Sequence, residues 1–335
     1  MTTRILTARD VRRLLPMPAC ITAMDLALRA LANGDAVLPL RPVIHLPDGT
    51  GALAAMPAYL GNPKTLGLKT ITIFPGNHGG PLDSHQGVVI MIDPANGRPF
   101  AILDASSITA IRTAAVSAVA TRALARPDAG DLAIIGTGVQ AMMHLEAMIC
   151  VRSIRRVRTY SRNPANVGRF AKEAARRMGI GVEPSRSARD AVDGADIICT
   201  VTASHTPVVE GAWIAAGAHI NAVGASLRSA RELDTEAVRR SSMYVDRRES
   251  ALAEAGEILI PMNNGMLDAN HIRGEIGELL ESRIAGRSSD DEVTLFKSLG
   301  LAIEDLAAAD VVLRNAAEQG IGQFIELGTA HDADG

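Results

Sequence analysis

The sequence predicts an α/β protein with a doubly wound, largely parallel sheet and a second lobe of mixed α+β structure. Three observations predict this. A short apolar run at 132–135 is followed by glycines in a characteristic spacing, strand-like and helix-like segments alternate after it, and short strand-like runs separated by Pro and Gly precede it. The chain is therefore expected to contain two lobes, which differ in how their strands pair.

The segment at 131–142 reads DLAIIGTGVQAM and carries the spacing G-x-G-x-x-A. Gly136 permits a tight turn, Gly138 lets the backbone approach a pyrophosphate, and Ala141 lets the following helix pack close to its strand. A strand, this turn and a helix together form the dinucleotide-binding fingerprint of a Rossmann-type sheet, with the phosphates at the helix N-terminus. A turn without a nucleotide is the alternative.

Length, charge and cysteine content exclude several classes of function. The 335 residues include 34 basic and 37 acidic ones, with no long run of one sign that would suggest a nucleic-acid groove or a membrane-binding face. No segment approaches the roughly 18 apolar residues of a membrane helix. Cys20, Cys150 and Cys199 are odd in number and far apart, which favours buried reduced thiols over disulfides or a metal site, and hence the cytoplasm. We expect a small-molecule partner.

The N-terminal lobe is expected to span about 1–118. Four arginines near the N-terminus leave a transit peptide open, but Thr7 and Asp10 have the spacing of a helix cap and favour a folded first helix. Turn residues then separate the strand-like runs of an antiparallel sheet. The expected helices are 7–15, 20–33 and 107–125, and the expected strands are 67–74, 87–92 and 99–104.

After residue 131 the pattern alternates as in a doubly wound sheet. The expected strands are 132–135, 157–161, 181–183, 197–202, 219–223 and 243–246, and the expected helices lie around 140–150, 164–178, 187–193 and 234–240. One apolar face of a long final helix, ending near Gly320, is traced by Leu295, Leu299, Ala302, Ile303, Leu306, Val312 and Ala316. We expect that helix to pack across the two lobes or against a partner subunit.

The cofactor-binding residues follow from this sheet. Ligands of such sheets bind at the carboxyl ends of the strands, so the turns after the fourth and fifth strands should lie near the nicotinamide. Where an NAD site usually has an acidic residue, this chain has a hydroxyl, a guanidinium and an amide, which suit a 2′-phosphate. NADPH is therefore favoured, with NADH possible. The predicted residues are Gly136, Thr137, Gly138, Val139, Gln140 and Ala141 at the turn, Ser161, Arg162 and Asn163 at the ribose, and Val201, Thr202, Ala203, Val223 and Gly224 at the nicotinamide.

Six separated motifs resemble those of the ornithine cyclodeaminase and μ-crystallin family over nearly the whole chain. They are GLKT at 67–70, SHQ at 84–86, IRTAA at 111–115, GTGVQA at 136–141, NAVGAS at 221–226 and FKSLG at 296–300. The family includes ornithine cyclodeaminase, ketimine and pyrroline-2-carboxylate reductases, amino-acid dehydrogenases and a thyroid-hormone-binding crystallin. The resemblance implies a Rossmann-type domain at 119–300, inserted in a substrate-binding and dimerisation lobe made of 1–118 and 301–335. It also implies a homodimer, and it adds Thr113 to the cofactor site.

The resemblance assigns Lys69 and Arg112 as the groups that bind substrate. Arg41 is a weaker candidate, because its motif, LRP, is short. A guanidinium can hold the carboxylate of an α-imino or α-keto acid with two parallel hydrogen bonds. Lys69 would share the carboxylate or, if burial lowers its pKa, give a proton to the nitrogen as hydride arrives. Without the resemblance, Lys69 and Arg112 would be interpreted as surface residues, and His85 fits a structural histidine as well as an acid or base.

Ser226 departs from the cyclodeaminase pattern. In ornithine cyclodeaminase an aspartate at the corresponding place is proposed to handle the distal amine, and a hydroxyl cannot serve as that base. The serine, together with RELD at 231–234, resembles the μ-crystallin and ketimine reductase branch. Ser226 therefore becomes a substrate-binding candidate.

The sequence thus predicts an NAD(P)H-dependent reductase of α-imino acids, acting in reverse as an amino-acid dehydrogenase. Two alternatives stay open: a cyclodeaminase that uses NAD+ catalytically, and a ligand-binding protein with vestigial turnover. Net consumption of NADPH with an imine separates the reductase from the cyclodeaminase. The side-chain pocket is not assigned, because Met56, Tyr59, Phe74 and His78 fit either its lining or the core.

Overall fold

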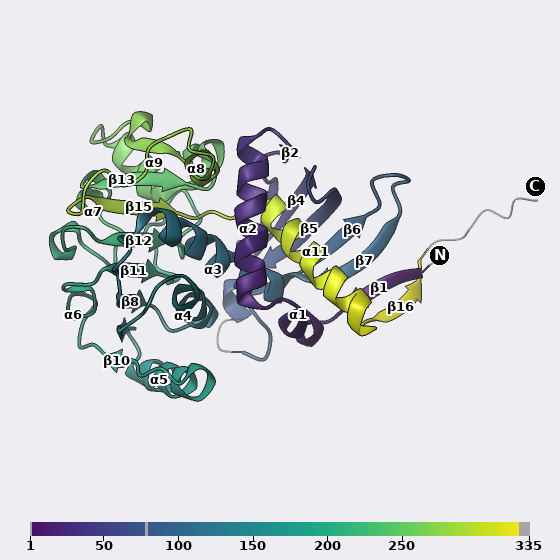
Figure 1. The fold of residues 1–335 in the computed structure, drawn as a ribbon, viewed down its shortest axis with the longest axis horizontal. Coiled ribbons are helices and arrows are strands. Elements are labelled where there is room, and N and C mark those ends of the chain that lie inside the picture. The colour runs from purple at the N-terminus through teal and green to yellow at the C-terminus, as the bar shows by residue number, and fades with distance from the viewer. Residues whose placement is uncertain (1, 78–79, 328–335) are drawn as a thin grey trace, which may run out of the picture. The chain divides into compact units, whose positions relative to one another are not determined.

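The computed structural model describes residues 2–77 and 80–327, which form two compact units (Figure 1). The first unit comprises Met1–Arg112 and Leu301–Gly335, and the second comprises Thr113–Gly300. The first division therefore falls within helix α3 (Ala105–Leu124), on the N-terminal side of the boundary expected at 118.

The first unit is built on a mixed sheet in the order β16-β1-β7-β6-β5-β4-β2, with β3 paired to β4. Its strands are β1 (Thr2–Leu6), β2 (Ala36–Val37), β3 (Val43–His45), β4 (Ala52–Leu60), β5 (Thr65–Ile73), β6 (His85–Ile92), β7 (Pro99–Asp104) and β16 (Gln323–Glu326). The β1–β7 pair is parallel, and the other pairs are antiparallel. The sequence predicted the central antiparallel strands but neither β1 nor β16.

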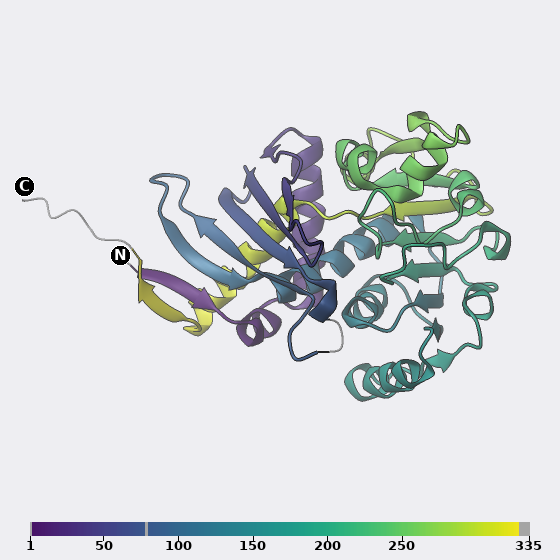
Figure 2. The same ribbon diagram turned by 180° about the vertical axis from the view of Figure 1, so that it is seen from behind.

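Helices α1 (Ala8–Leu14), α2 (Met17–Ala32) and α11 (Ala302–Gln319) belong to the same unit. Thr7 caps α1 in a capping box with Asp10, as the sequence predicted. The second helix begins at Met17, earlier than expected, because a proline is tolerated in a first helical turn. Helix α11 packs against α2 and lies on strands β4, β5 and β6 (Figures 1 and 2).

The two faces of this sheet differ. On β5, Thr65, Gly67, Lys69 and Ile71 are buried, and the residues between them are half-buried. Gly67 faces α11 so closely that a Cβ atom there would lie 2.7 Å from Leu306 Cδ2 and 2.5 Å from the carbonyl oxygen of Ile90. The opposite face carries half-buried apolar side chains, and no helix of the described part of this unit covers it; these side chains are Leu66, Leu68, Ile90, Ile92, Phe100 and Ile102.

The second unit is a doubly wound parallel sheet in the order β10-β9-β8-β11-β12-β15-β13-β14. Its strands are β8 (Asp131–Ile135), β9 (Arg156–Tyr160), β10 (Glu183–Pro184), β11 (Ile197–Thr200), β12 (His219–Ala222), β13 (Ser241–Val245), β14 (Ile272–Glu275) and β15 (Val293–Lys297). The strand order reverses between β8 and β11, which is where such sheets bind ligands. This arrangement confirms the predicted Rossmann-type fold class.

The helices of the second unit are α4 (Val139–Val151), α5 (Pro164–Met178), α6 (Ala188–Val192), α7 (Thr235–Arg239), α8 (Arg248–Glu254), α9 (Gly256–Asn263) and α10 (Ile276–Leu280). Single 3-10 turns are formed by Pro75–Asn77 in the first unit and by Gly211–Trp213 and Ala269–His271 in the second. The predicted helices around 140–150, 164–178, 187–193 and 234–240 are all present, whereas α8, α9, α10 and β14 were not predicted.

The prediction was wrong for Leu295 and Leu299, which were placed on the final helix. Leu295 lies in β15, a buried strand between β12 and β13. β-Branched and aromatic residues favour a strand at 293–297, and Gly300, at φ +81°, separates this strand from the helix that begins at Ala302. Helix α11 also contacts the sheet of its own unit, which the expectation of a helix packed across two lobes did not foresee.

Candidate active site

Lys69 and Arg112, the predicted substrate-binding pair, lie together in the first unit, because both pair with the carboxylate of Asp305. Lys69 Nζ lies 2.6 Å from Asp305 Oδ2, and Arg112 Nε lies 3.0 Å from Asp305 Oδ1. Arg112 Nη1 also lies 2.7 Å from Glu304 Oε2. All four side chains are at most 5% exposed. We call Lys69, Arg112, Glu304 and Asp305 the charge cluster.

The fold explains why these charges meet. Lys69 is on the face of β5 that packs against α11, and Glu304 and Asp305 are in the first turn of α11, where acidic side chains are favoured by the helix dipole. Buried charges are tolerated when they are paired. Sequence reasoning missed Glu304 and Asp305, although these two adjacent acidic residues interrupt an apolar stretch from Leu301 to Ala309, which is buried in the structure.

The cluster perturbs Lys69. The pKa of Lys69 is lowered to about 8: burial is the largest cause, the carboxylate of Asp305 opposes it, and the positive charges of Arg112 and Arg41 add to it. Lys69 is therefore able to exchange a proton near neutral pH. Arg41, which is half-buried ahead of β3, is close enough for its charge to act on Lys69, so the structure brings all three predicted cations of this unit together.

Neutral and titratable groups surround the same lysine. Its Nζ donates a hydrogen bond of 3.4 Å to Thr109 Oγ1, and Met56 is its direct neighbour on β4. Burial lowers the pKa of His85, and the charge of Lys69 lowers it further, which places His85 within electrostatic range of the cluster. Of the other possible lining residues, Tyr59 and Phe74 are half-buried, and His78 lies outside the described residues.

In the second unit, the turn after β8 has the geometry that a bound phosphate requires. Gly136 has φ +115°, and a Cβ atom there would lie 2.7 Å from the carbonyl oxygen of Val201, so no other residue fits without strain. Gly138 is the N-cap of α4, and a Cβ atom on it would meet nothing within 4 Å. The space beside this helix N-terminus is therefore open, and the first N–H groups of a helix can accept a pyrophosphate there.

Two further observations fit a nucleotide at this turn. Ala141 is fully buried, which lets α4 pack closely on its strand, while Val139 is 67% exposed. The side-chain oxygen Oε1 of Gln140 is buried and has no hydrogen-bond partner among the described residues. A buried polar atom without a partner is costly, so a ligand group that donates to it would be stabilised.

The loops that follow β11 and β12 are held by a buried glutamate, Glu232. Its carboxylate accepts hydrogen bonds from Thr200 Oγ1 at 2.9 Å, from Thr202 N and Oγ1 at 2.6 and 2.7 Å, and from Gly224 N at 2.6 Å. A Cβ atom at Gly224 would lie 2.0 Å from the Thr202 carbonyl oxygen. Burial raises the pKa of Glu232. The predicted nicotinamide-side segments, 201–203 and 223–224, are thus tied to one another.

The network extends to residues that sequence reasoning missed. Glu257 Oε1 accepts a 3.0 Å hydrogen bond from Glu232 N, and Glu257 Oε2 lies 3.2 Å from Lys297 Nζ. Lys297 also donates to the carbonyl oxygen of Ala225, next to the half-buried Ser226. Glu232 and Lys297 lie in motifs that carried the family resemblance, but their role here depends on three distant loops.

The segment after β9 was predicted to bind the adenosine ribose. Asn163 caps α5, because its Oδ1 accepts a 3.0 Å hydrogen bond from Ala165 N. Ser161 is half-buried, Arg162 is exposed, and Arg162 forms no ion pair with any described residue. Ser161 and Arg162 are therefore available to a ligand, while the amide oxygen of Asn163 is committed to the helix.

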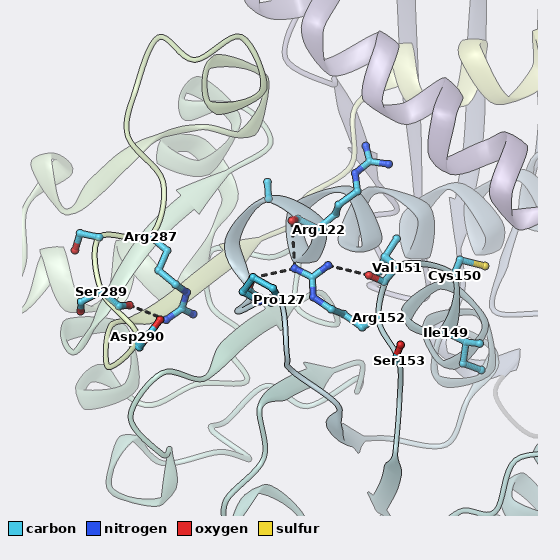
Figure 3. Close-up of a pocket in the computed structure, with 13 residues that line it drawn as sticks. Arg122, Pro127, Ile149, Cys150, Val151, Arg152, Ser153, Arg287, Ser289 and Asp290 are labelled. Atoms are coloured by element: carbon cyan, nitrogen blue, oxygen red, sulfur yellow. Dashed lines mark hydrogen bonds between the residues drawn. The ribbon is translucent and has the colours of Figure 1, made fainter.

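A large cavity of about 770 Å³ lies elsewhere in the second unit (Figure 3). It is lined by the ends of α3 and α4 and by the loop ahead of β15, so it lies at the amino ends of the strands, opposite the predicted cofactor edge. Its arginines are committed to the fold: Arg152 donates to the carbonyls of Thr121 and Ala125, and Arg287 donates to that of Leu124.

The cysteines differ from the expectation in one case. All three are free thiols, and Cys20 and Cys199 are buried, but Cys150 is exposed and lines this cavity. Cys150 is the last but one residue of α4, on the side of that helix that its sheet does not cover.

Among residues 2–77 and 80–327, no three His, Cys, Asp or Glu side chains are grouped so that they would hold a metal ion. No single described helix has both the length and the apolar character needed to cross a membrane; α1 and α2 meet that requirement only when taken together, and they are bent by 85° at their junction.

Comparison with known proteins agrees with the fold. Residues 1–320 match the model of the ornithine cyclodeaminase/mu-crystallin family. The ketimine reductase mu-crystallin of Mus musculus is 40% identical over 289 residues, which cover 84% of this chain and 88% of that protein. The Delta(1)-pyrroline-2-carboxylate reductase of Thermococcus litoralis, solved with NADH and L-proline, has a TM-score of 0.94 at 40% identity, covering 96% of this chain and 99% of that one.

A third relative is an archaeal alanine dehydrogenase dimer with bound NAD, at a TM-score of 0.92 and 34% identity, covering 98% of this chain and all of that one (100%). The residues matched by the family model, 1–320, span both units. The chain belongs to the ornithine cyclodeaminase/mu-crystallin family.

Proposed function

We propose that this protein is an NAD(P)H-dependent reductase of α-imino acids, which converts the C=N bond of a ketimine carboxylate to an amine and acts in reverse as an amino-acid dehydrogenase. The observation that carries the proposal is the buried charge cluster around Lys69, whose pKa of about 8 suits proton transfer near neutral pH. Reductases of C=N bonds among the relatives support it.

The substrate carboxylate is bound by Arg112 and Lys69, with Arg41 beside them. The two carboxylates of the cluster balance the charges of Lys69 and Arg112. A guanidinium orients a carboxylate in one plane, which suits the carboxylate of an α-imino acid. The hydroxyl of Ser226 is assigned to the binding of the substrate's side chain, and it cannot act as the base that a cyclodeaminase needs.

Lys69 donates the proton. With a pKa of about 8, its amine is mainly protonated at pH 7, so it gives a proton to the imine nitrogen and regains one from water. The reduced nicotinamide, when bound, supplies the hydride that the imino carbon accepts. One hydride and one proton together reduce the C=N bond, and the carboxylate stays paired to Arg112 until the amino acid is released.

The nucleotide is held by the residues of the second unit. We assign the pyrophosphate to Gly136–Ala141 and the nicotinamide side to 201–203, Val223 and Gly224. Thr113, on α3, is assigned to the same cofactor site. NADPH is the preferred cofactor in this proposal, because Ser161 and Arg162 are available to a 2′-phosphate and no carboxylate stands beside them at 161–163. The solved relatives with NADH and NAD make NADH the competing cofactor.

We further propose a homodimer in the cytoplasm. The half-buried apolar face of the first sheet, which includes Leu68, Ile90 and Ile102, suits a second copy of the chain, and the archaeal alanine dehydrogenase is a dimer. Free thiols at Cys20 and Cys199 suit a reducing compartment. Sedimentation analysis of the purified protein tests the dimer, and a monomer at micromolar concentration contradicts it.

A substrate panel tests the proposed function. Delta(1)-pyrroline-2-carboxylate, the corresponding six-membered cyclic imine, and pyruvate with ammonia or methylamine are each offered with NADH and with NADPH. We expect net loss of nicotinamide absorbance and formation of the amino acid. With ornithine, ammonia release without net change in absorbance would identify a cyclodeaminase and contradict the proposal. Binding of nucleotide without turnover of any imine would also contradict it.

A further inference from the structure

We propose that Asp305 is the positioning residue of the site: it holds Lys69 in its charged form and fixes it beside Arg112. This inference rests on the proposed function, in which Lys69 donates the proton. Asp305 is fully buried, and its two oxygens divide between the two substrate groups, with Oδ2 at 2.6 Å from Lys69 Nζ and Oδ1 at 3.0 Å from Arg112 Nε. One carboxylate therefore sets the spacing of both cations.

The backbone fixes where that carboxylate lies. Asp305 precedes Leu306, whose side chain occupies the space that a Cβ atom of Gly67 would need. Gly67 stands two residues before Lys69 on the same face of β5. The close approach of α11 to β5 at Gly67 thus also sets the distance between Asp305 and Lys69, and neither depends on a flexible loop.

The charges around Lys69 make Asp305 decisive. The groups that face the lysine are Arg112 from α3, Arg41 from the segment ahead of β3, His85 from β6, Thr109 with a neutral hydroxyl, and Asp305 from α11. Within residues 2–77 and 80–327, Asp305 is the carboxylate that pairs with Lys69, while Glu304 pairs with Arg112. Without Asp305, the lysine would face two guanidinium groups, and its ammonium form would lose its main support.

Glu304 provides a matched control. It is adjacent to Asp305 on the same helix and is equally buried, and its carboxylate contacts Arg112 without contacting Lys69. Glu304→Gln and Asp305→Asn each remove one buried negative charge with little change in volume. A general loss of stability or of charge balance affects both variants, whereas an effect on the proton of Lys69 requires Asp305.

The experiment is the pH dependence of kcat/KM for imine reduction in the wild type, Asp305→Asn and Glu304→Gln. Activity requires protonated Lys69, so it falls as the pH rises through the pKa of the lysine. Removal of a contacting carboxylate lowers that pKa, and we expect the alkaline limb of Asp305→Asn to move down by about one pH unit or more. The limb of Glu304→Gln moves by less than half as much, even where its KM for the imino acid rises. Equal shifts in the two variants, or an unmoved limb in Asp305→Asn, overturn the inference.

Lys69→Arg separates this inference from the proposed function. An arginine stays protonated and is a poor proton donor, so the activity that remains should be low and should show no alkaline limb. If the limb persists in Lys69→Arg, Lys69 is not the proton donor and the proposed proton step fails, together with the inference. If the limb disappears there but stays unmoved in Asp305→Asn, only the inference fails. Should Asp305→Asn not fold, as judged by circular dichroism, Asp305→Glu decides: its longer side chain displaces the carboxylate, and a wild-type kcat with an unshifted limb overturns the inference.

Discussion

The candidate sites of the two units differ in the groups from which they are built. The first unit builds its candidate site from buried side-chain charges on β5, α3 and α11, which are distant in the sequence. The second unit builds its site from backbone: a glycine turn, the N-terminus of α4, and two loops tied by Glu232. In the proposed function, paired side chains bind the substrate carboxylate and backbone N–H groups bind the dinucleotide.

This difference has a physical consequence. Loss of one charge in the first unit leaves its partners buried without compensation, which is expensive. Loss of one hydrogen bond in the second unit leaves the others in place, so its effect should be smaller. The following predictions test that contrast, from the largest expected effect to the smallest.

Arg112→Met should have the largest effect. It leaves Glu304 and Asp305 buried with one cation fewer, so we expect a loss of about 3–5 kcal/mol in the free energy of unfolding and a fall in kcat/KM of at least about 1000-fold. Denaturant titration and steady-state kinetics measure the two losses. Arg112→Lys, which keeps the charge, should recover most of the stability and little of the activity. Wild-type stability in Arg112→Met would show that the cluster is not held by its charges.

Gly136→Ala and Gly138→Ala test the nucleotide turn as a pair. Gly136 has a positive φ and no room for a Cβ atom, so the first variant should lose about 1–3 kcal/mol of stability as well as nucleotide affinity. Gly138 faces open space, so the second variant should unfold like the wild type and still bind nucleotide more weakly. Calorimetric titration with NADPH checks both. An unchanged nucleotide affinity in Gly138→Ala would show that the phosphates do not bind at this turn.

The pairing of these glycines shows what a sequence can predict. The fingerprint at 136–141 is local, because turn, strand and helix are adjacent in the chain, so spacing alone located it. Lys69 and Arg112 were found through a resemblance, since nothing local distinguishes them from surface residues. Glu304 and Asp305 were missed, because their role depends on contacts of α11 with β5, and these two elements lie far apart in the sequence.

The same reasoning explains the other errors. Leu295 and Leu299 fell by chance at helical spacing with Ala302 and Leu306, and the glycine at 300 was not weighed against that pattern. Glu232 was noted only as part of a motif, since the strand ends that it ties together come from residues 200–202 and 224. Periodicity reports which face of an element is apolar, and it does not report which buried charges will meet.

Glu232→Gln tests the loops beside the proposed nicotinamide site. An amide presents an NH2 group where a carboxylate oxygen accepts backbone N–H donors, so at least one of the bonds to Thr202 and Gly224 is lost. An unsatisfied buried donor costs about 1–3 kcal/mol, and we expect the KM for nucleotide to rise roughly 5- to 100-fold. Glu210→Gln, at an exposed position of the same unit, is the control. An unchanged KM would make Glu232 irrelevant to the cofactor.

Arg162→Ala should have the smallest effect and concerns the choice of nucleotide. A charge-assisted hydrogen bond to a 2′-phosphate is worth about 1.5 kcal/mol, so the KM for NADPH should rise roughly 10-fold while that for NADH stays constant. Arg176→Ala, at the other end of α5, should change neither. Equal KM values for NADPH in the wild type and Arg162→Ala would leave the preference for NADPH without support.

The most direct test of the central claim follows a single atom. Reduced nicotinamide nucleotide carrying deuterium at both hydrogen positions of C4 is mixed with Delta(1)-pyrroline-2-carboxylate and the protein, and the amino-acid product is analysed by mass spectrometry. The proposed reaction predicts one deuterium at the α-carbon of proline, formed in step with oxidised nucleotide, and no such product with Lys69→Met. Proline without deuterium, or no consumption of nucleotide with this or any other imino acid, would contradict the assignment of the protein as an imine reductase.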